Sequence, residues 1–329
     1  MKFKVKKEPV KIVLTLLCVF FLVAGIVLLL QAWEQRHYYL SSSEPENSNP
    51  GELYYNGEWY KKKKSVETIL LIGVDKYSDP DAVESYINTQ QSDFLIAVVA
   101  DHAADTYCAI PINRDTMAEI TTLGLDGKKT GTTVAQLALA HTYGTGGKDS
   151  AENTAEAVSK YLYSNKIDHY IAVTMDAVSI INDAVGGVTV TVLDDINQDL
   201  VKGETVTLMG QDALVYVRAR GGLEDSTNVH RMERQQQYLE GLKKAFEKLA
   251  QNNSSAFSEV LLSASEYMTS DCTVNELSRI YNLTKDYEFK GFVEIPGESK
   301  TGEEFMEFYT DEDKLREIVV GLYYTKVSE

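Results

Sequence analysis

Short apolar segments rich in β-branched residues recur along the chain, and they predict strands. The segments are 68–74, 94–100, 107–112, 169–174, 188–193 and 214–217, with one more candidate at 292–295. Several of them are continuously apolar instead of alternating, which is typical of strands that are covered on both faces. The pattern therefore predicts a sheet that lies inside the protein.

Between these segments, apolar residues recur at helical spacing. Asp149 and Glu152 form a predicted capping pair at the start of one helix. A second helix opens at Asp176 and is closed by the glycine pair 186–187. A third begins near Met232, with its apolar face at Leu239, Leu242, Phe246 and Leu249. Strands interleaved with covering helices predict a fold of the α/β class, a layered domain with a central mixed β-sheet covered by helices.

The amino-terminal segment 12–30 carries no charge over 19 residues. At a rise of about 1.5 Å per residue it would span close to the roughly 30 Å hydrocarbon core of a membrane. The preceding residues 1–11 are rich in lysine, which favours the cytoplasmic side, and aromatic residues typical of a membrane interface follow the segment. The alternative is a cleaved signal peptide, but that has a shorter apolar run and a small-residue cleavage site, which 31–34 does not offer.

These features divide the chain into a cytoplasmic tail at 1–11, a transmembrane helix at 12–30, an extracytoplasmic stalk at 31–52 and an extracytoplasmic domain at 53–329. The predicted location is the cell membrane, crossed once, with the carboxyl-terminal domain outside. An Asn-Gly pair at 56–57, set between aromatic residues, predicts a hairpin where the folded domain begins. The lysines at 61–64 are either a phosphate or membrane-surface patch or a solvated charge run.

The composition narrows the class of protein. With 329 residues, 44% of them hydrophobic and 25% charged, the chain is long and apolar enough for a sizeable core. The net charge is −17, so no diffuse basic surface for nucleic acid is expected, and any phosphate site must be a local exception. Cys108 and Cys272 are the only cysteines outside the apolar segment; they are interpreted as two small buried thiols, and the alternative is a disulfide between them.

Arginine provides such a local exception. Only 8 of the 32 basic residues are Arg, and four of them, Arg218, Arg220, Arg231 and Arg234, fall within 17 positions. The first two end a predicted strand and the other two open a predicted helix, so each pair shares a face. Guanidinium groups bind phosphate oxygens in pairs, and a helix amino terminus adds free N–H groups. The alternative is that these arginines form ordinary surface pairs with nearby acidic residues.

Further candidates lie at strand ends. Arg114, followed by Asp115, comes directly after a predicted strand. Asp75 follows one predicted strand and Asp93 precedes the next, so their carboxylates meet at one sheet edge if the two strands are antiparallel neighbours. Two carboxylates with phosphate oxygens suit Mg²⁺, and the alternative is that each Asp only caps a turn. The five His residues show no metal-ligand spacing.

Six ordered motifs resemble those of the LytR-CpsA-Psr family. They are TILLIGVD at 68–75, QSD at 91–93, INRD at 112–115, DAVGGV at 183–188, LMGQDALVYVRAR at 208–220 and RMERQ at 231–235. The likeness covers roughly 66–246 and lies behind a short basic tail and a predicted anchor. Six motifs in this order make the resemblance specific.

The resemblance implies an extracytoplasmic enzyme, a glycopolymer phosphotransferase of mainly Gram-positive bacteria. Such proteins transfer a glycopolymer, usually a teichoic acid or a capsular polysaccharide, from a polyprenyl-pyrophosphate carrier to a hydroxyl of peptidoglycan. The implied partners are the polyprenyl-pyrophosphate-linked glycopolymer, peptidoglycan and the membrane, with no nucleic acid. A buried apolar cavity between sheet and helices would take the lipid.

Carried over by motif, the resemblance also implies roles for single residues. Asp75 and Asp93 would hold Mg²⁺, and the arginines would grip the pyrophosphate. The residues implied to stabilise the transition state or to accept the proton of the attacking hydroxyl are Asp75, Arg114, Asp115, Arg218 and Arg220. The residues implied to bind the substrate are Gln91, Arg231, Arg234 and Gln235.

Several positions depart from the usual pattern of the family. Arg commonly stands directly before Ser-Asp in the second motif, where this chain has Gln91, and often shortly after the first-motif Asp, where residues 76–77 are Lys and Tyr. An Asp three residues before the position of Arg231 is Asn228 here, and an Asn before the Ala-rich segment is Ala138. The lost positive charge predicts weaker binding of pyrophosphate.

Three functions of different class are weighed as hypotheses. The first is an Mg²⁺-dependent glycopolymer transferase at the outer face of the membrane. The second, favoured by Gln91 and Asn228, is a catalytically weakened relative that binds polyprenyl phosphate or wall polymer as a regulator or scaffold. A third, an anchored adhesion or structural domain, is disfavoured by the six ordered motifs.

Overall fold

The computed structural model describes residues 52–75, 88–124, 126–219, 229–251, 253–302 and 305–327. The predicted tail, membrane helix and all but the last residue of the stalk lie outside these ranges, and so does the Lys-Tyr pair at 76–77. Within the described ranges, none of the helices combines the length and apolar character that a membrane span requires.

Strands and helices alternate along the chain. The strands are β1 (Glu52–Tyr55), β2 (Glu58–Lys62), β3 (Val66–Val74), β4 (Ser92–Asp101), β5 (Thr106–Ile112), β6 (Met117–Leu123), β7 (Lys129–Gln136), β8 (His169–Thr174), β9 (Val188–Thr191), β10 (Thr205–Leu208), β11 (Met268–Ser270), β12 (Glu288–Phe292), β13 (Gly297–Thr301), β14 (Met306–Thr310) and β15 (Tyr324–Lys326). The α-helices are α2 (Lys148–Tyr161), α3 (Met175–Ala184), α4 (Gln211–Arg218), α5 (Val229–Ala250), α6 (Ala256–Ser263), α7 (Val274–Thr284) and α8 (Glu312–Tyr323), with short 3₁₀ helices η1 (Leu137–Thr142) and η2 (Ser265–Tyr267).

The chain divides into two compact units, 1–62 with 325–329, and 63–324. In the first unit, β1 and β2 form the predicted hairpin. Asn56 and Gly57 at its turn both have positive φ, 49° and 83°, as the two-residue turn of this type requires.

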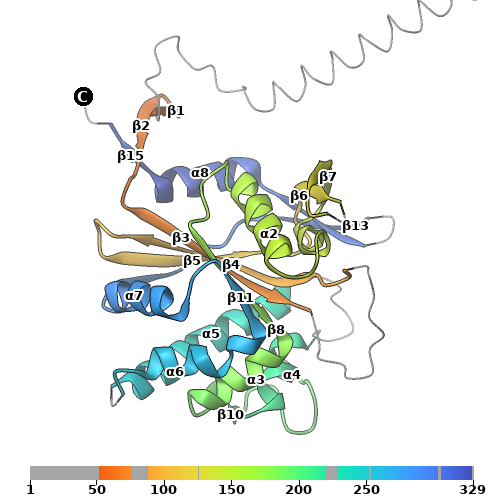
Figure 1. Cartoon of the computed structure of the whole chain (residues 1–329), viewed down its shortest axis with the longest axis vertical. Helices are drawn as coiled ribbons and strands as arrows, with labels where there is room; N and C mark the ends of the chain where they lie inside the picture. The colour runs from red at the N-terminus through yellow and green to blue at the C-terminus, as the bar shows by residue number, and fades with distance from the viewer. Residues whose placement is uncertain are drawn as a thin grey trace, which may run out of the picture. The chain divides into compact units, whose positions relative to one another are not determined.

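A six-stranded sheet in the order β11-β8-β3-β4-β5-β12 forms the centre of the second unit (Figure 1). β3 pairs antiparallel with β4 and parallel with β8, and β5 pairs antiparallel with β4 and parallel with β12. The sheet is therefore mixed, which confirms the predicted α/β fold with a central mixed sheet and covering helices.

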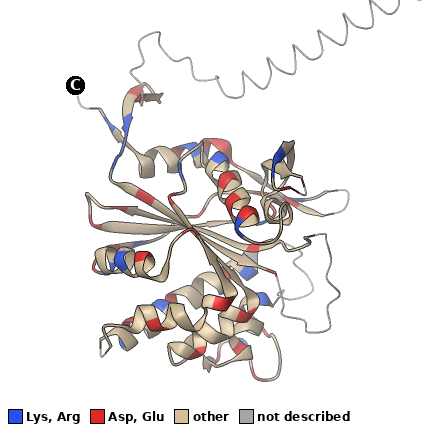
Figure 2. Ribbon diagram, in the orientation of Figure 1, with Lys and Arg blue, Asp and Glu red and all other residues tan. Residues whose placement is uncertain are grey.

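The two faces of the sheet are covered by different helices, as Figure 1 shows. Leu70 and Ile72 of β3 are fully buried on one face, in a core cluster with residues of α2 and α8. Leu71 and Gly73 alternate with them and face the layer of α3, α5 and α6. Charged residues of both signs lie on the covering helices, while long stretches of the central strands carry none (Figure 2).

The second layer has its own core, formed by residues of α3, β9, β10, α4, α5 and α6. Gly241 of α5 allows close packing here, because a Cβ at this position would meet Val188 Cγ1 at 2.6 Å. The predicted glycine stop after α3 is confirmed. Gly186 and Gly187 have φ values of 85° and 90°, and Gly187 N–H donates to Asn182 O.

Several predicted details are wrong. The segment 214–217 is not a strand but part of α4, because the buried residues Ala213, Leu214, Tyr216 and Val217 follow helical spacing after the glycine N-cap Gly210. The strand predicted at 292–295 is β12, which ends at Phe292, and the strand predicted at 188–193 ends at Thr191. The N-cap of α2 is Gly147 rather than Asp149, although Asp149 accepts hydrogen bonds from Thr145 N and Ser150 N within this first turn.

Candidate functional site

The predicted meeting of two carboxylates at one sheet edge is confirmed at the level of the backbone. Val74 at the end of β3 pairs with Ser92 at the start of β4, and Asp75 N–H donates to Gln91 O over 2.9 Å. Asp75 and Asp93 therefore lie at the same end of neighbouring antiparallel strands. Within the described part of the chain the two acids do not pair with each other; Asp75 meets Arg218, and Asp93 meets Arg114 and Arg231.

Asp93 is the centre of a buried ion cluster. Its side chain is only 8% exposed, and its two carboxylate oxygens meet Nη1 of Arg114 and, at 3.5 Å, Nη1 of Arg231. Arg114 comes from the turn after β5 and Arg231 from the first turn of α5, so two sequence-distant motifs converge on one strand end. Two of the five arginines that the sequence offers as candidates for one anion site therefore lie together.

The turn that carries Arg114 is built by local hydrogen bonds. Asn113, itself buried, accepts the N–H of Asp115 with its side chain at 3.0 Å and the N–H of Thr116 with its carbonyl at 3.1 Å. Ala138 N–H donates to Arg114 O over 3.0 Å. Position 138 is Ala instead of the Asn typical of the family, but its backbone N–H still holds the carbonyl of Arg114.

The guanidinium group of Arg114 has further partners. Nη2 donates to Gln91 Oε1 at 2.5 Å and Nε to Asp115 Oδ1 at 3.3 Å. Gln136 donates through Nε2 to the same Asp115 oxygen at 3.0 Å and to Met306 O at 2.6 Å. Gln136 is a buried residue that the sequence analysis missed, because it belongs to none of the six motifs and only the pairing of β6 with β7 brings it here.

Arg218 reaches the site from another direction. It is the last residue of α4, and its Nη2 lies 3.2 Å from Asp75 Oδ1, with both side chains nearly two-fifths exposed. The predicted strand that would have aimed Arg218 and Arg220 to one face is absent, since α4 is a helix there. Arg220 and Asn228 lie outside the described residues. A guanidinium at a helix carboxyl end is favoured by the helix dipole.

Arg234 does not share the surroundings of Arg231. Its side chain is fully buried, Nη1 pairs with Asp194 Oδ2 at 2.5 Å, and Nη2 contacts Ala219 O. Ala219 directly follows Arg218, so Arg234 holds the end of α4 in place. Gln235 of α5 donates to Val217 O of α4 at 3.3 Å, so α5 supports α4 at a second position.

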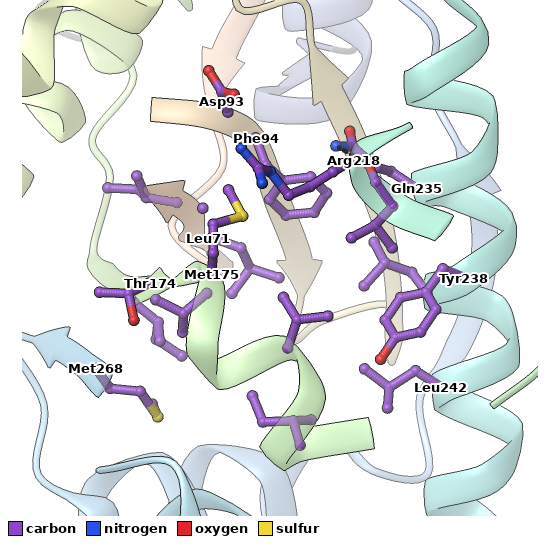
Figure 3. A pocket seen from close by; sticks show the side chains of 18 of the residues that line it. Leu71, Asp93, Phe94, Thr174, Met175, Arg218, Gln235, Tyr238, Leu242 and Met268 are labelled. Atoms are coloured by element: carbon purple, nitrogen blue, oxygen red, sulfur yellow. Dashed lines mark hydrogen bonds between the residues drawn. The ribbon is translucent and has the colours of Figure 1, made fainter. Parts of the chain in front are cut away.

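An apolar cavity of about 230 Å³ begins at these charged groups. Asp93, Arg218, Arg231 and Gln235 lie among its lining residues, and Figure 3 shows Asp93, Arg218 and Gln235 at one end with Leu242 and Met268 at the other. The apolar walls come from the sheet and from the layer of α3, α5 and α6. The remaining lining residues are Leu71, Ile72, Gly73, Phe94, Ile171, Val173, Thr174, Met175, Val178, Ile181, Val217, Tyr238, Leu239 and Leu261.

No described residue that lines the apolar end of the cavity carries a charge. Burial and the nearby carboxylate of Asp183 raise the pKa of Tyr238 above its usual range, so its hydroxyl stays neutral at physiological pH. That hydroxyl donates to Asn182 Oδ1 at 3.3 Å. Leu261 and Met268, which belong to the region after the last motif, line the cavity without any sequence signal that marks them.

The arrangement has two chemically distinct ends. The apolar part suits a hydrocarbon chain, since burying apolar surface contributes roughly 25 cal/mol per Å². The other end offers three guanidinium groups and two carboxylates, which suit phosphate oxygens and a hard divalent cation. A ligand that fills both is an amphiphile with a phosphorylated head.

Comparison with known proteins gives a consistent result. The LytR_cpsA_psr family model matches residues 29–320. The chain is 31% identical over 179 residues to a polyisoprenyl-teichoic acid–peptidoglycan teichoic acid transferase TagU of Halalkalibacterium halodurans, a match that covers 53% of this chain and 51% of that protein. It is 27% identical over 276 residues to a TagU of Bacillus cereus, covering 81% and 78%. The chain thus spans about half the length of the first relative.

Solved structures share the fold. The TM-score is 0.59 with TagV of B. subtilis, at 24% identity over 79% of this chain and 96% of that one. It is also 0.59 with TagT bound to LI-WTA, at 18% identity over 85% and 94%. With the protein gbs0355 of Streptococcus agalactiae it is 0.63, at 22% identity over 78% and 86%.

Proposed function

The chain belongs to the LytR_cpsA_psr family, and we propose that it is a membrane-anchored, Mg²⁺-dependent phosphotransferase. It moves a glycopolymer from a polyprenyl-pyrophosphate carrier to a hydroxyl of peptidoglycan. Relatives at 27–31% identity are teichoic acid transferases by name, which supports a transferase of this class. The segment 12–30 anchors the chain and leaves the site outside the cytoplasm in this proposal.

The observation that carries the proposal is the junction between the cavity and the ion cluster. Arg218 and Arg231 line the same cavity as Leu242 and Met268. A polyprenyl chain in the apolar part would therefore place its pyrophosphate among the guanidinium groups. Soluble nucleotide or sugar phosphates would leave the apolar walls without a partner.

The reaction needs little beyond positioning and charge neutralisation. The oxygen of the acceptor hydroxyl attacks the phosphorus that carries the polymer, a new O–P bond forms, and the P–O bond to the second phosphate breaks. Polyprenyl phosphate leaves with the bonding electrons, and the hydroxyl proton goes to a carboxylate. Arg114, Arg218 and Arg231 stabilise the charge that builds on the phosphoryl oxygens.

The donor set at the strand ends fits Mg²⁺. Carboxylate oxygens are the ligands this hard cation prefers, and it usually leaves several positions to water and phosphate. Asp93 is buried with two arginines and Asp75 is more open, and these two carboxylates would hold the ion. When bound, Mg²⁺ supplies further neutralisation of the phosphoryl oxygens.

Two carboxylates remain candidates for the proton acceptor. Asp115 is held by Arg114 and Gln136 and its side chain is 15% exposed. Asp75 is 39% exposed and better placed to meet an acceptor that arrives from solvent. We assign the acceptor role to Asp75 and the positioning of Arg114 to Asp115.

The test uses the full chain in detergent with a polyprenyl-pyrophosphate oligosaccharide, peptidoglycan fragments and Mg²⁺. We expect release of polyprenyl phosphate together with a phosphodiester-linked product. Asp93→Ala should abolish both and Arg218→Ala should lower both strongly, while the matched control Arg316→Ala, on α8 over the opposite face of the sheet, should retain them. Product formation at an undiminished rate in both site variants would overturn the proposal.

A weakened binding protein is the second candidate, and Gln91 is the observation that favours it. The neutral amide occupies a position where the family usually has a guanidinium, so the site binds pyrophosphate with one positive charge fewer. In the same assay this candidate predicts tight binding of the lipid without any turnover.

A further inference from the structure

A second cluster of metal-ligating side chains lies at the other end of β8 from the cavity rim. His169 is the first residue of β8, and Asp271 and Cys272 directly follow β11. β11 pairs antiparallel with β8, which brings the start of one beside the end of the other. His169 Nδ1 lies 3.0 Å from Asp271 Oδ2 and 3.0 Å from Cys272 Sγ, and one ligand atom of each residue lies within 4.8 Å of the others.

We propose that His169, Asp271 and Cys272 bind a Zn²⁺ ion. One imidazole nitrogen, one thiolate sulfur and one carboxylate oxygen form a mixed donor set that suits this borderline-soft cation, whereas Mg²⁺ and Ca²⁺ prefer oxygen alone. Three protein ligands leave the fourth tetrahedral position to water. The site is distinct from the arginine cluster and does not depend on the proposed transferase activity.

The ligands are held by a second set of hydrogen bonds. Tyr170 N–H donates to Asp271 Oδ1 at 2.9 Å, which leaves Oδ2 directed at His169. Ser270 Oγ donates to Tyr170 O at 2.7 Å and accepts the N–H of Cys272 at 3.0 Å. The turn between β11 and α7 is therefore fixed before an ion arrives, which lowers the entropy that binding must overcome.

Glu67 supports His169 from the far side of the ring. Its Oε1 lies 3.7 Å from His169 Nε2, and its Oε2 lies 3.1 Å from His102 Nε2. At 3.7 Å this carboxylate makes no hydrogen bond to the ring, but its negative charge favours a proton on Nε2, which leaves the Nδ1 lone pair available to a metal.

An ion can reach the cluster from solvent. The side chains of His169 and Asp271 are 30% and 27% exposed, and Cys272 is half-buried. Cys108, the other free thiol of the described residues, belongs to β5 and is buried in the apolar core. The two cysteines are therefore matched probes, one inside the proposed site and one outside it.

The test titrates the full chain in detergent with Zn²⁺ and with Co²⁺ after chelator treatment. We expect one site whose Co²⁺ complex shows a thiolate-to-metal charge-transfer band in the near ultraviolet. Cys272→Ser should remove the band, and Cys108→Ser should keep it. Glu67→Gln should weaken the affinity about 10-fold because it removes the negative charge beside the second ring nitrogen of the histidine.

A second measurement needs no variant. Saturating Zn²⁺ should slow the alkylation of Cys272 at least tenfold and leave the rate at Cys108 unchanged. Binding at Asp75 and Asp93 would give no thiolate band and no protection, so the two sites are distinguishable. Absence of the band in the unsubstituted chain, or alkylation of Cys272 at the same rate with and without Zn²⁺, overturns the proposal and leaves a plain thiol–imidazole pair.

Discussion

Arg114 Nη2 donates a hydrogen bond to Gln91 Oε1 over 2.5 Å. The two residues come from different motifs, the segment before β4 and the turn after β5. Gln91 stands where Arg is usual in the family. Arg114 therefore has a neutral amide oxygen beside it as a hydrogen-bond acceptor, instead of a second positive charge. The amide therefore fixes the direction of the guanidinium that also contacts Asp93.

Gln91→Ala should lower kcat/KM for the polyprenyl-pyrophosphate substrate by about 10- to 100-fold. The reason is the loss of a hydrogen bond to a charged group, which is worth about 1.5 to 3 kcal/mol, and each 1.4 kcal/mol corresponds to a factor of ten. Steady-state kinetics of polyprenyl phosphate release measures this effect. Gln90→Ala serves as the control, since no side-chain bond links Gln90 to the arginines, and an equal loss in both variants would contradict the assignment.

Asp93→Asn should act in two opposite directions. It leaves Arg114 and Arg231, whose side chains are 13% and 9% exposed, without their shared carboxylate, and breaking such buried pairs destabilises proteins by about 3 to 5 kcal/mol. The free energy of unfolding in urea measures that loss. The two guanidinium groups, no longer neutralised by the Asp93 carboxylate, should at the same time bind inorganic pyrophosphate several-fold more tightly, which calorimetry measures.

The control for this substitution is Asp126→Asn. Asp126 pairs with Lys128 on the surface, with side chains 57% and 82% exposed, so no measurable change in stability is expected. Weaker pyrophosphate binding by Asp93→Asn in the absence of Mg²⁺ would show that Asp93 does not compete with the ligand for the arginines.

Much of the fold follows from local sequence patterns, whereas the site depends on long-range pairing. The continuous apolar runs place β3, β4, β5 and β8 correctly, because strands covered on both faces leave that signature. The four apolar residues at 214–217 do not distinguish helix from strand, and only the preceding turn at Gly210 settles the matter. Arg218 is consequently at a helix end.

Sequence spacing could not predict that Arg231 and Arg234 have different ion-pair partners. Both lie on the same side of α5, yet Arg231 meets Asp93 at the start of β4 and Arg234 meets Asp194 shortly after β9. Spacing predicts a shared helix face, and the partners on that face are set by the tertiary fold. Gln136, Leu261 and Met268 stayed unnoticed for the same reason.

Leu261→Trp should weaken binding of the polyprenyl chain and leave binding of inorganic pyrophosphate unchanged. Leu261 lines the cavity of about 230 Å³, and an indole there fills space that the lipid needs. The neighbouring Leu262 is 59% exposed, so Leu262→Trp is the matched control and should bind lipid normally. Fluorescent polyprenyl phosphate binding measures both variants, and equal affinities would place the lipid elsewhere.

Asp101 should make stability depend on pH at the acidic end. Burial alone would raise the pKa of Asp101, but hydrogen bonds from Ser65 and Lys63 outweigh it and hold the pKa below its usual value. Because the folded pKa is depressed, the stabilisation is complete above the unfolded pKa of about 3.9 and is lost as pH falls through the folded pKa. Unfolding free energies of the unsubstituted chain and of Asp101→Asn should differ at pH 7 and converge in acid. A constant difference over the whole range would contradict this linkage.

Arg234 should act on catalysis through Arg218. Its guanidinium group pairs with Asp194 and contacts Ala219 O, so it holds the residue that follows Arg218 and touches no part of the cavity. Arg234→Met keeps most of the buried volume but removes these bonds, and it should lower kcat more than it raises KM because the positioning of Arg218 matters most in the transition state.

If Arg234 works in this way, Arg218→Ala should lower kcat/KM much less in the Arg234→Met background than in the unsubstituted chain. Unfolding midpoints of the single and double variants separate this effect from a general loss of stability, and additive effects on ln(kcat/KM) would assign Arg234 a purely structural role.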